Sequence, residues 1–177
     1  GKSNHDLGEF GSALEQRGYR IQPLNLAETL AIPHNLGLLV LAGPKVELLP
    51  GEVRQIQDYL NSGGNLLWLF DPDGLFGLEP LASDLGIAPL PGRIVDANVR
   101  QLGVDDPTVA LVSQYPDHPA TDGFELMSLY PQAAALERKI GQNNSWQATP
   151  LLSTLDRSWN ETGPIQGQVR RDEEQGE

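Results

Sequence analysis

The chain has 177 residues, with 24 Asp and Glu against 12 Lys and Arg and no cysteine. The resulting net charge of −12 argues against binding to nucleic acid or to an anionic membrane surface, because both need basic protein surface. The lack of cysteine excludes disulfides, thiolate metal ligands and a cysteine nucleophile.

The N-terminal part of the chain carries short apolar patterns. An apolar stripe at helical spacing predicts a first helix that ends at Gly18, and it consists of Leu7, Phe10 and Leu14. Residues 19–24 alternate imperfectly and predict an edge strand. Residues 26–32 predict a short helix or turn, closed by Pro33.

The clearest pattern lies between residues 37 and 74. A continuous apolar run at residues 38–42 is typical of a strand covered on both faces, as in a parallel sheet. A helical stripe follows, and it consists of Val53, Ile56 and Leu60. Gly63-Gly64 supplies the left-handed residue that ends this helix. A second apolar strand is predicted at residues 66–70, so that the segment forms a parallel strand–helix–strand unit.

The second half of the chain, from about residue 90, is less regular. It predicts a short helix at residues 78–86 and strands within residues 93–96, 108–112, 126–136 and 151–154. The alternation of helices and strands indicates an α/β fold with a three-layer, mostly parallel sheet flanked by helices. We expect a single α/β domain over residues 1–160 and a polar, disordered tail over residues 161–177.

Several motifs in order resemble a known family. They are Gly43-Pro44 after the first strand, Tyr59-Leu60-Asn61-Ser62-Gly63-Gly64 at the helix end, Asp71-Pro72 after the second strand, and His118-Pro119-Ala120-Thr121. In these segments the chain resembles the GldG-like auxiliary component of uncharacterised ABC-type transport systems, the gliding-motility-associated family. The resemblance covers most of residues 5–136.

The resemblance implies a fold similar to flavodoxin-like or class I glutamine-amidotransferase-like domains. It implies an extracytoplasmic domain on the periplasmic face of the bacterial inner membrane, with the permease and ATPase subunits of the same system as partners. Membrane attachment would run only through segments outside this chain. We expect the sequence to be a fragment of a longer protein, because it begins with Gly1 and ends in a charged run.

Candidate ligand-binding residues are Asp71, Asp73 and His118. Asp71 and Asp73 follow a predicted parallel strand, and ligands of α/β sheets bind at the carboxyl ends of strands. Two carboxylates there can hold a cation or act as acid and base. The alternative is that Asp71-Pro72-Asp73-Gly74 is a turn. For His118 the alternative is a hydrogen bond that fixes its own loop.

No nucleophile elbow, phosphate loop or metal-ligand spacing is present in the sequence. We therefore predict no catalytic residue, no metal and no cofactor. The leading hypothesis is a non-catalytic interaction domain of a transport complex. The alternatives are a domain that binds an exported sugar or other small substrate at the strand ends, and a divergent hydrolase using Asp71, Asp73 and His118.

Overall fold

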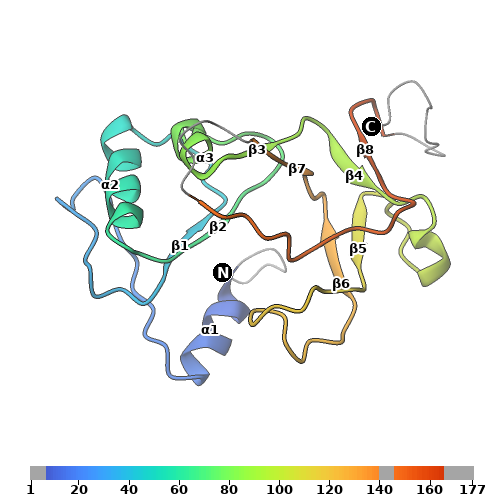
Figure 1. Cartoon of the computed structure of the whole chain (residues 1–177), viewed down its shortest axis with the longest axis horizontal. Coiled ribbons are helices and arrows are strands. Elements are labelled where there is room, and N and C mark those ends of the chain that lie inside the picture. Colours follow the sequence, from blue (N-terminus) through green and yellow to red (C-terminus); the bar gives the residue numbers. More distant parts are fainter. Residues whose placement is uncertain (1–6, 140–145, 166–177) are drawn as a thin grey trace.

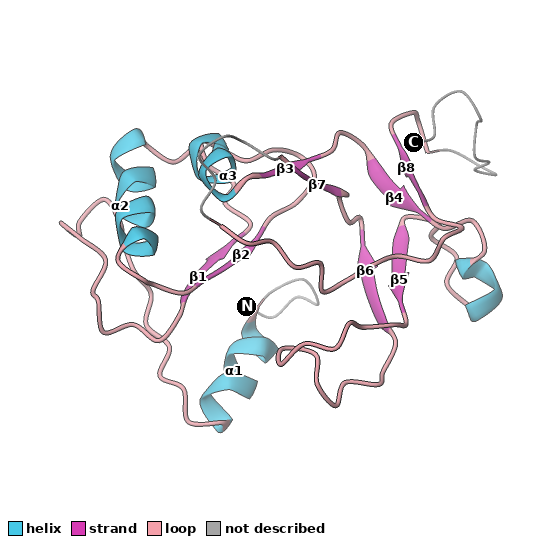
Figure 2. Ribbon diagram, in the orientation of Figure 1, coloured by secondary structure: helices cyan, strands magenta, loops and turns pink. Residues whose placement is uncertain are grey.

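Helices gather around one parallel pair of strands in the first half of the chain, whereas the second half is built from antiparallel pairs (Figure 1, Figure 2). This computed structural model describes residues 7–139 and 146–165. The helices are α1 (Gly8–Gln16), α2 (Pro50–Asn61) and α3 (Glu79–Leu85), with a 3-10 turn η1 (Val99–Leu102). The parallel pair is β1 (Leu39–Ala42) with β2 (Leu66–Leu69).

Helix α2 is defined at both ends by its own sequence. At the start, Pro50 occupies the first turn, and the Glu52 carboxylate accepts a hydrogen bond from the Leu49 amide at 2.8 Å. At the end, Gly63 has a φ of +91°, the left-handed conformation predicted for this position. The buried face of the helix, which includes the predicted stripe, consists of Val53, Ile56, Tyr59 and Leu60.

The main core lies between α2, α3 and one face of the parallel pair. Ile56 and Leu78 are fully buried at its centre. Alternate residues of the two strands pack against this core, and they are Leu39, Leu41, Leu66 and Trp68. The predicted parallel strand–helix–strand unit is therefore confirmed.

Three antiparallel pairs form the second half. They are β3 (Ile87–Pro89) with β7 (Leu136–Arg138), β4 (Arg93–Val95) with β8 (Trp159–Glu161), and β5 (Val109–Val112) with β6 (Ser128–Pro131). Backbone bonds from the Leu90 and Ile94 amides to Ala135 and Ala133 continue the pairing of β3 along the chain. The segment from β3 to β4 therefore runs between two partners that come from much later in the sequence.

The predicted fold class is wrong. The described residues form short two-stranded sheets with one parallel pair, and not a three-layer, mostly parallel, flavodoxin-like or glutamine-amidotransferase-like sheet. The reason is that alternating helices and strands imply parallel crossovers only when consecutive strands join the same sheet. Here the later strands pair with distant segments in the opposite direction.

Individual elements were predicted with mixed success. Helix α1, helix α3, β4 and β5 lie where they were expected, and β6 falls within the predicted 126–136 segment. Residues 19–24 and 151–154 are not strands, and residues 26–28 form a turn, one of the two alternatives predicted for residues 26–32. In the predicted tail, Glu161 belongs to β8, and residues 166–177 lie outside the described part of the chain.

Candidate functional site

The carboxyl ends of β1 and β2 bring a lysine and an aspartate together. The two strands are parallel, so the residues that follow them meet at one edge. The Lys45 ammonium donates a hydrogen bond to Asp71 Oδ2. This bond, together with the charge of Asp71, raises the pKa of Lys45 above its ordinary value. Both side chains are exposed, at 70% and 54%, so the pair is well hydrated.

The second candidate carboxylate is also paired. Arg93 Nη2, at the start of β4, donates a hydrogen bond to Asp73 Oδ1 at 3.0 Å. Residues 72 and 73 form a turn, as the alternative interpretation predicted, although the bond of Asp71 goes to a side chain and not to its own backbone. The two acids thus face one cation each. Each negative charge is therefore already balanced by a cationic side chain, which weakens the electrostatic attraction for a metal cation.

His118 lies in a loop that it helps to hold. Its Nδ1 accepts a hydrogen bond from the Ala120 amide at 3.1 Å, as expected for the loop-fixing role. Among the residues that the structure describes, His118 has no hydrogen bond or ion pair with a carboxylate. The described residues also contain no group of three or more metal-ligating side chains. Ligand binding by Asp71, Asp73 and His118 stays a prediction.

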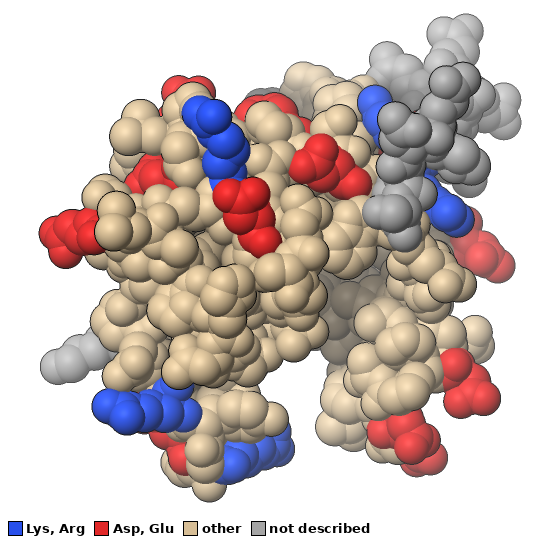
Figure 3. Space-filling model, turned by 60° about the vertical axis from the view of Figure 1, so that its left-hand side comes forward, with Lys and Arg blue, Asp and Glu red and all other residues tan. Residues whose placement is uncertain are grey.

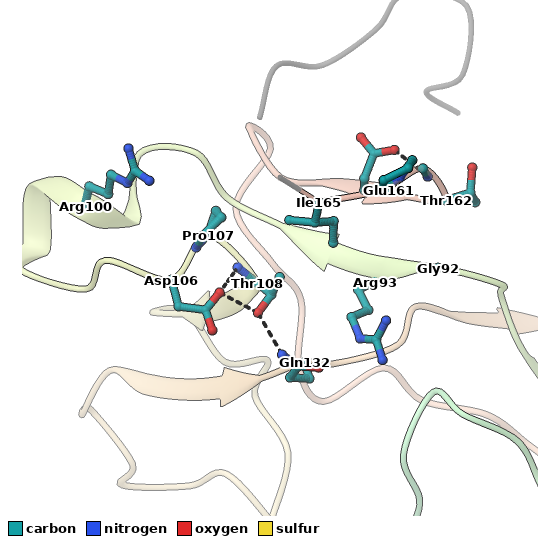
Figure 4. A pocket seen from close by; sticks show the side chains of 12 residues that line it. Gly92, Arg93, Arg100, Asp106, Pro107, Thr108, Gln132, Glu161, Thr162 and Ile165 are labelled. Carbon is teal, nitrogen blue, oxygen red and sulfur yellow. Dashed lines mark hydrogen bonds between the residues drawn. The ribbon is translucent and has the colours of Figure 1, made fainter. Parts of the chain in front are cut away.

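A cavity of about 690 Å³ opens between β4, β8 and the loop before β5 (Figure 4). This volume is typical of small-molecule sites. Residues from five separate parts of the chain line it, and they are Gly92, Arg93, Arg100, Asp106, Pro107, Thr108, Gln132, Glu161, Thr162, Gly163, Pro164 and Ile165. Two arginines face two acids in this lining, so its formal charge is balanced.

One wall of the cavity is a chain of hydrogen bonds. Asp106 Oδ1 accepts bonds from the Thr108 amide at 2.9 Å and the Thr108 hydroxyl at 2.6 Å. The Thr108 hydroxyl in turn accepts a bond from Gln132 Nε2 at 3.4 Å (Figure 4). Gln132 has a φ of +57°, a left-handed conformation that residues other than glycine seldom adopt. Such strain tends to occur at functional sites.

The opposite wall carries a fixed anion and an unsatisfied donor. Glu161 accepts hydrogen bonds from Trp159 Nε1 at 3.0 Å and from the Gly163 amide at 2.8 Å. These bonds lower the pKa of Glu161, with the Trp159 bond the larger cause. On the same wall, Arg93 is the register partner of Glu161, and its Nε is buried with no hydrogen-bond partner among the described residues. An unsatisfied buried donor costs roughly 1–3 kcal/mol.

A second surface of interest is the face of the parallel pair that points away from the core. We call it the outer face, and it consists of Val40, Ala42, Leu67 and Leu69. Val40 is 39% exposed and Leu69 is 40% exposed. The face carries no charged side chain, and Figure 3 shows a side of the molecule whose middle is free of acidic and basic residues. Strands of a parallel pair are normally covered on both faces.

Sequence reasoning missed most of these partners. Lys45 was within reach of prediction, because parallel strands end at the same edge and Lys45 stands just beyond the first of them. No sequence pattern predicted that Arg93 pairs with Asp73 or that the cavity residues lie together. These residues meet through the β4–β8 and β5–β6 pairings, whose partners are far apart in sequence.

The architecture defines a small α/β domain with one parallel strand pair, whose candidate site is polar and charge-balanced. A solved structure described as the mmIFT52 N-terminal domain has a similar fold, with a TM-score of 0.59 and 22% sequence identity over 82% of this chain and 70% of that chain. No curated protein sequence matches the chain.

The chain belongs to the family described as an ABC-type uncharacterized transport system, whose sequence model matches residues 2–176. It is therefore an auxiliary component of such a system, as the resemblance in the sequence motifs implied. The match is to the family as a whole, and the narrower GldG-like and gliding-motility assignments stay predictions. Among the described residues, no helix is both long and apolar enough to cross a membrane.

Proposed function

We propose that this domain is a non-catalytic, extracytoplasmic interaction module, which holds the auxiliary protein to the permease and, through the assembled complex, to the ATPase of its transport system. Family membership supports the transport context. Placement on the periplasmic side of the inner membrane follows from the resemblance of the motifs.

The observation that carries this proposal is the outer face of the parallel pair. Its four apolar side chains, Val40, Ala42, Leu67 and Leu69, line up in register across β1 and β2. An apolar sheet face without charge is poorly suited to water and well suited to a protein partner. The chain as a whole is acidic, so the absence of charge at this face is a local property.

The runner-up function is ligand binding at the strand ends. The position of Asp71 and Asp73 beyond β2 favours it, because this edge of a sheet commonly forms binding sites. The pairing of both acids with Lys45 and Arg93 weakens it, because a ligand would have to displace or share those cations. The interaction module remains the better supported of the two.

Co-purification tests the proposal. The full-length parent protein would be expressed with a tag, solubilised in detergent, and assayed for the permease and ATPase that accompany it. Leu69→Asp places a charge on the outer face and should reduce the recovered permease by about tenfold, since burying an unpaired charge at an interface is costly. Leu30→Asp is the matched control, because Leu30 is fully exposed and belongs to neither β1 nor β2.

Equal recovery of the permease with both variants would remove the outer face from the interface. Failure of wild-type protein to recover either subunit, in several detergents, would refute the interaction module itself. In that case Asp71→Ala and Asp73→Ala become the variants of choice, with ligand screening in place of co-purification.

A further inference from the structure

The cavity between β4, β8 and the loop before β5 has features that the interaction function does not use. Its lining comes from β4, β8 and the loop before β5, which lie apart from β1 and β2 (Figure 1). Its strands and loops come from the second half of the chain, whereas the outer face belongs to the first half. A ligand bound in the cavity would therefore not occupy the outer face.

One carboxylate that lines the cavity retains an unused hydrogen-bond acceptor. Among the described residues, Asp106 Oδ2 has no partner, whereas its Oδ1 already accepts two hydrogen bonds. Arg93 Nε is a buried donor with no partner, while Nη2 of the same side chain is held by Asp73. The lining therefore offers a free acceptor, Asp106 Oδ2, on a side chain that two other bonds fix in place, whereas the unpartnered Arg93 Nε is buried away from the cavity.

Gln132 holds a backbone conformation that favours glycine. Glycine would adopt its φ of +57° without strain, yet the position carries a side chain whose amide points to the Thr108 hydroxyl (Figure 4). The Gln132 backbone amide donates to the Thr108 carbonyl at 2.9 Å, a bond that glycine would also make, and the side chain adds one long hydrogen bond of 3.4 Å. The amide has a further donor hydrogen and an acceptor oxygen to offer a ligand.

The balance of charge decides the class of ligand. Arg93 and Arg100 attract an anion, but Asp106 and Glu161 in the same lining repel it, and Glu161 is held as an anion by two hydrogen bonds. A hydroxyl group can donate to a carboxylate and accept from a guanidinium or amide at once. Pro107 and Ile165 add apolar surface beside these polar groups (Figure 4).

We propose that this cavity binds a neutral polyhydroxylated ligand, of the class of a sugar unit, through Asp106 and Gln132. The free carboxylate oxygen of Asp106 accepts from a ligand hydroxyl, and the Gln132 amide donates to a ligand oxygen. Gln132 is the specificity residue, because its strained backbone holds the amide at the cavity wall.

The experiment is an amide NMR titration of the full 177-residue chain. The probes are three neutral disaccharides (maltose, cellobiose and lactose), with sodium phosphate at matched ionic strength as the anionic probe. The proposal expects saturable shifts for at least one disaccharide, centred on the amides of Gly92, Thr108 and Gly163, and no saturable shift there with phosphate.

Gln132→Gly separates binding from folding. Glycine relieves the left-handed strain, so the melting temperature should hold or rise, while the lost amide weakens disaccharide binding by roughly five- to tenfold. Gln114→Gly is the matched control, because Gln114 lies in an exposed loop that does not line the cavity. It should leave the affinity unchanged.

Three results would overturn the proposal. They are the lack of a saturable shift with any of the three disaccharides, cavity shifts with phosphate in place of the sugars, and equal affinity of Gln132→Gly and Gln114→Gly. None of them bears on permease recovery, so this inference and the interaction function fail independently.

Discussion

Replacing Arg157 with methionine would strip a fully buried carboxylate of its charged partner. Asp96 is 0% exposed and follows β4 directly, and Arg157 Nε donates to both of its oxygens at 3.0 Å. The bond ties the segment before β8 to the segment after β4, across 61 residues of sequence. Methionine fills much of the same space but offers no donor, so the substitution removes the ion pair with little loss of packing.

The expected cost follows from what remains around Asp96. Breaking a buried ion pair by removing one partner typically costs about 3–5 kcal/mol. Two features reduce this here, since the Asn98 amide still donates to Asp96 Oδ1 at 2.9 Å and the Arg157 side chain is 41% exposed, which lets water approach. We expect Arg157→Met to destabilise the fold by about 2–4 kcal/mol, a large share of the 5–15 kcal/mol of a typical domain.

The assay is urea denaturation followed by far-UV circular dichroism, with Asp96→Asn completing a double-mutant cycle. Asp96→Asn should destabilise the wild-type chain by about 1–2 kcal/mol, but should stabilise Arg157→Met, because it removes the uncompensated charge. Arg54→Met is the control, since Arg54 is exposed and makes only a 3.4 Å contact with the Pro50 carbonyl. The reasoning is refuted if Asp96→Asn is equally destabilising in both backgrounds, or if Arg157→Met unfolds like the control.

Two further predictions concern the pairing of β4 with β8. Gly92→Ala should lower stability by more than about 2 kcal/mol in thermal melts, because Gly92 has a φ of +101° and an added Cβ would lie 2.3 Å from the Glu161 carbonyl oxygen. Gly18→Ala is the control and should cost less, because Gly18 has a similar φ of +88° but no atom near the added Cβ. The pKa of Glu161 is lowered from 4.5 by the bonds from Trp159 and Gly163, so its contribution to stability is present above pH 4.5 and is lost as the pH falls through the folded value. Glu161→Gln should therefore be less stable than wild type at neutral pH, and the gap should narrow as the pH falls below 4.5. A gap that stays constant across thermal melts at these pH values would contradict this assignment.

The parts of the fold that were predictable are those set by neighbours in sequence. The motif that ends α2 is an example. Gly63 takes the left-handed turn, and Gly64 is required because a Cβ there would lie 2.3 Å from the Tyr59 ring. Tyr59 also exchanges hydrogen bonds with the Asn65 backbone at 3.2 Å, which fixes the turn into β2. Helix, turn and parallel strand therefore follow from about a dozen residues.

The antiparallel second half was not predictable in the same way. Each of β3, β4, β7 and β8 has three residues, too few for an alternation pattern to show which face is buried or which strand is the partner. The partners lie far along the chain, as with Val95 and Trp159. What selects them is tertiary, such as the bond between Asp96 and Arg157 and the close approach of Gly92 to Glu161.

Arg93 connects the predicted site at the strand ends with the cavity, which the sequence did not predict. Its Nη2 pairs with Asp73, a residue that sequence reasoning singled out, while its unpartnered Nε lies in a side chain that lines the cavity. Asp73→Ala would therefore release Arg93 as well as remove a carboxylate, and a loss of binding in that variant cannot be assigned to the strand ends alone. Asp71→Ala is the cleaner probe of the strand ends, because its partner Lys45 does not line the cavity. If Asp73→Ala alters the cavity shifts and Asp71→Ala does not, the two candidate sites are joined through the Arg93 side chain.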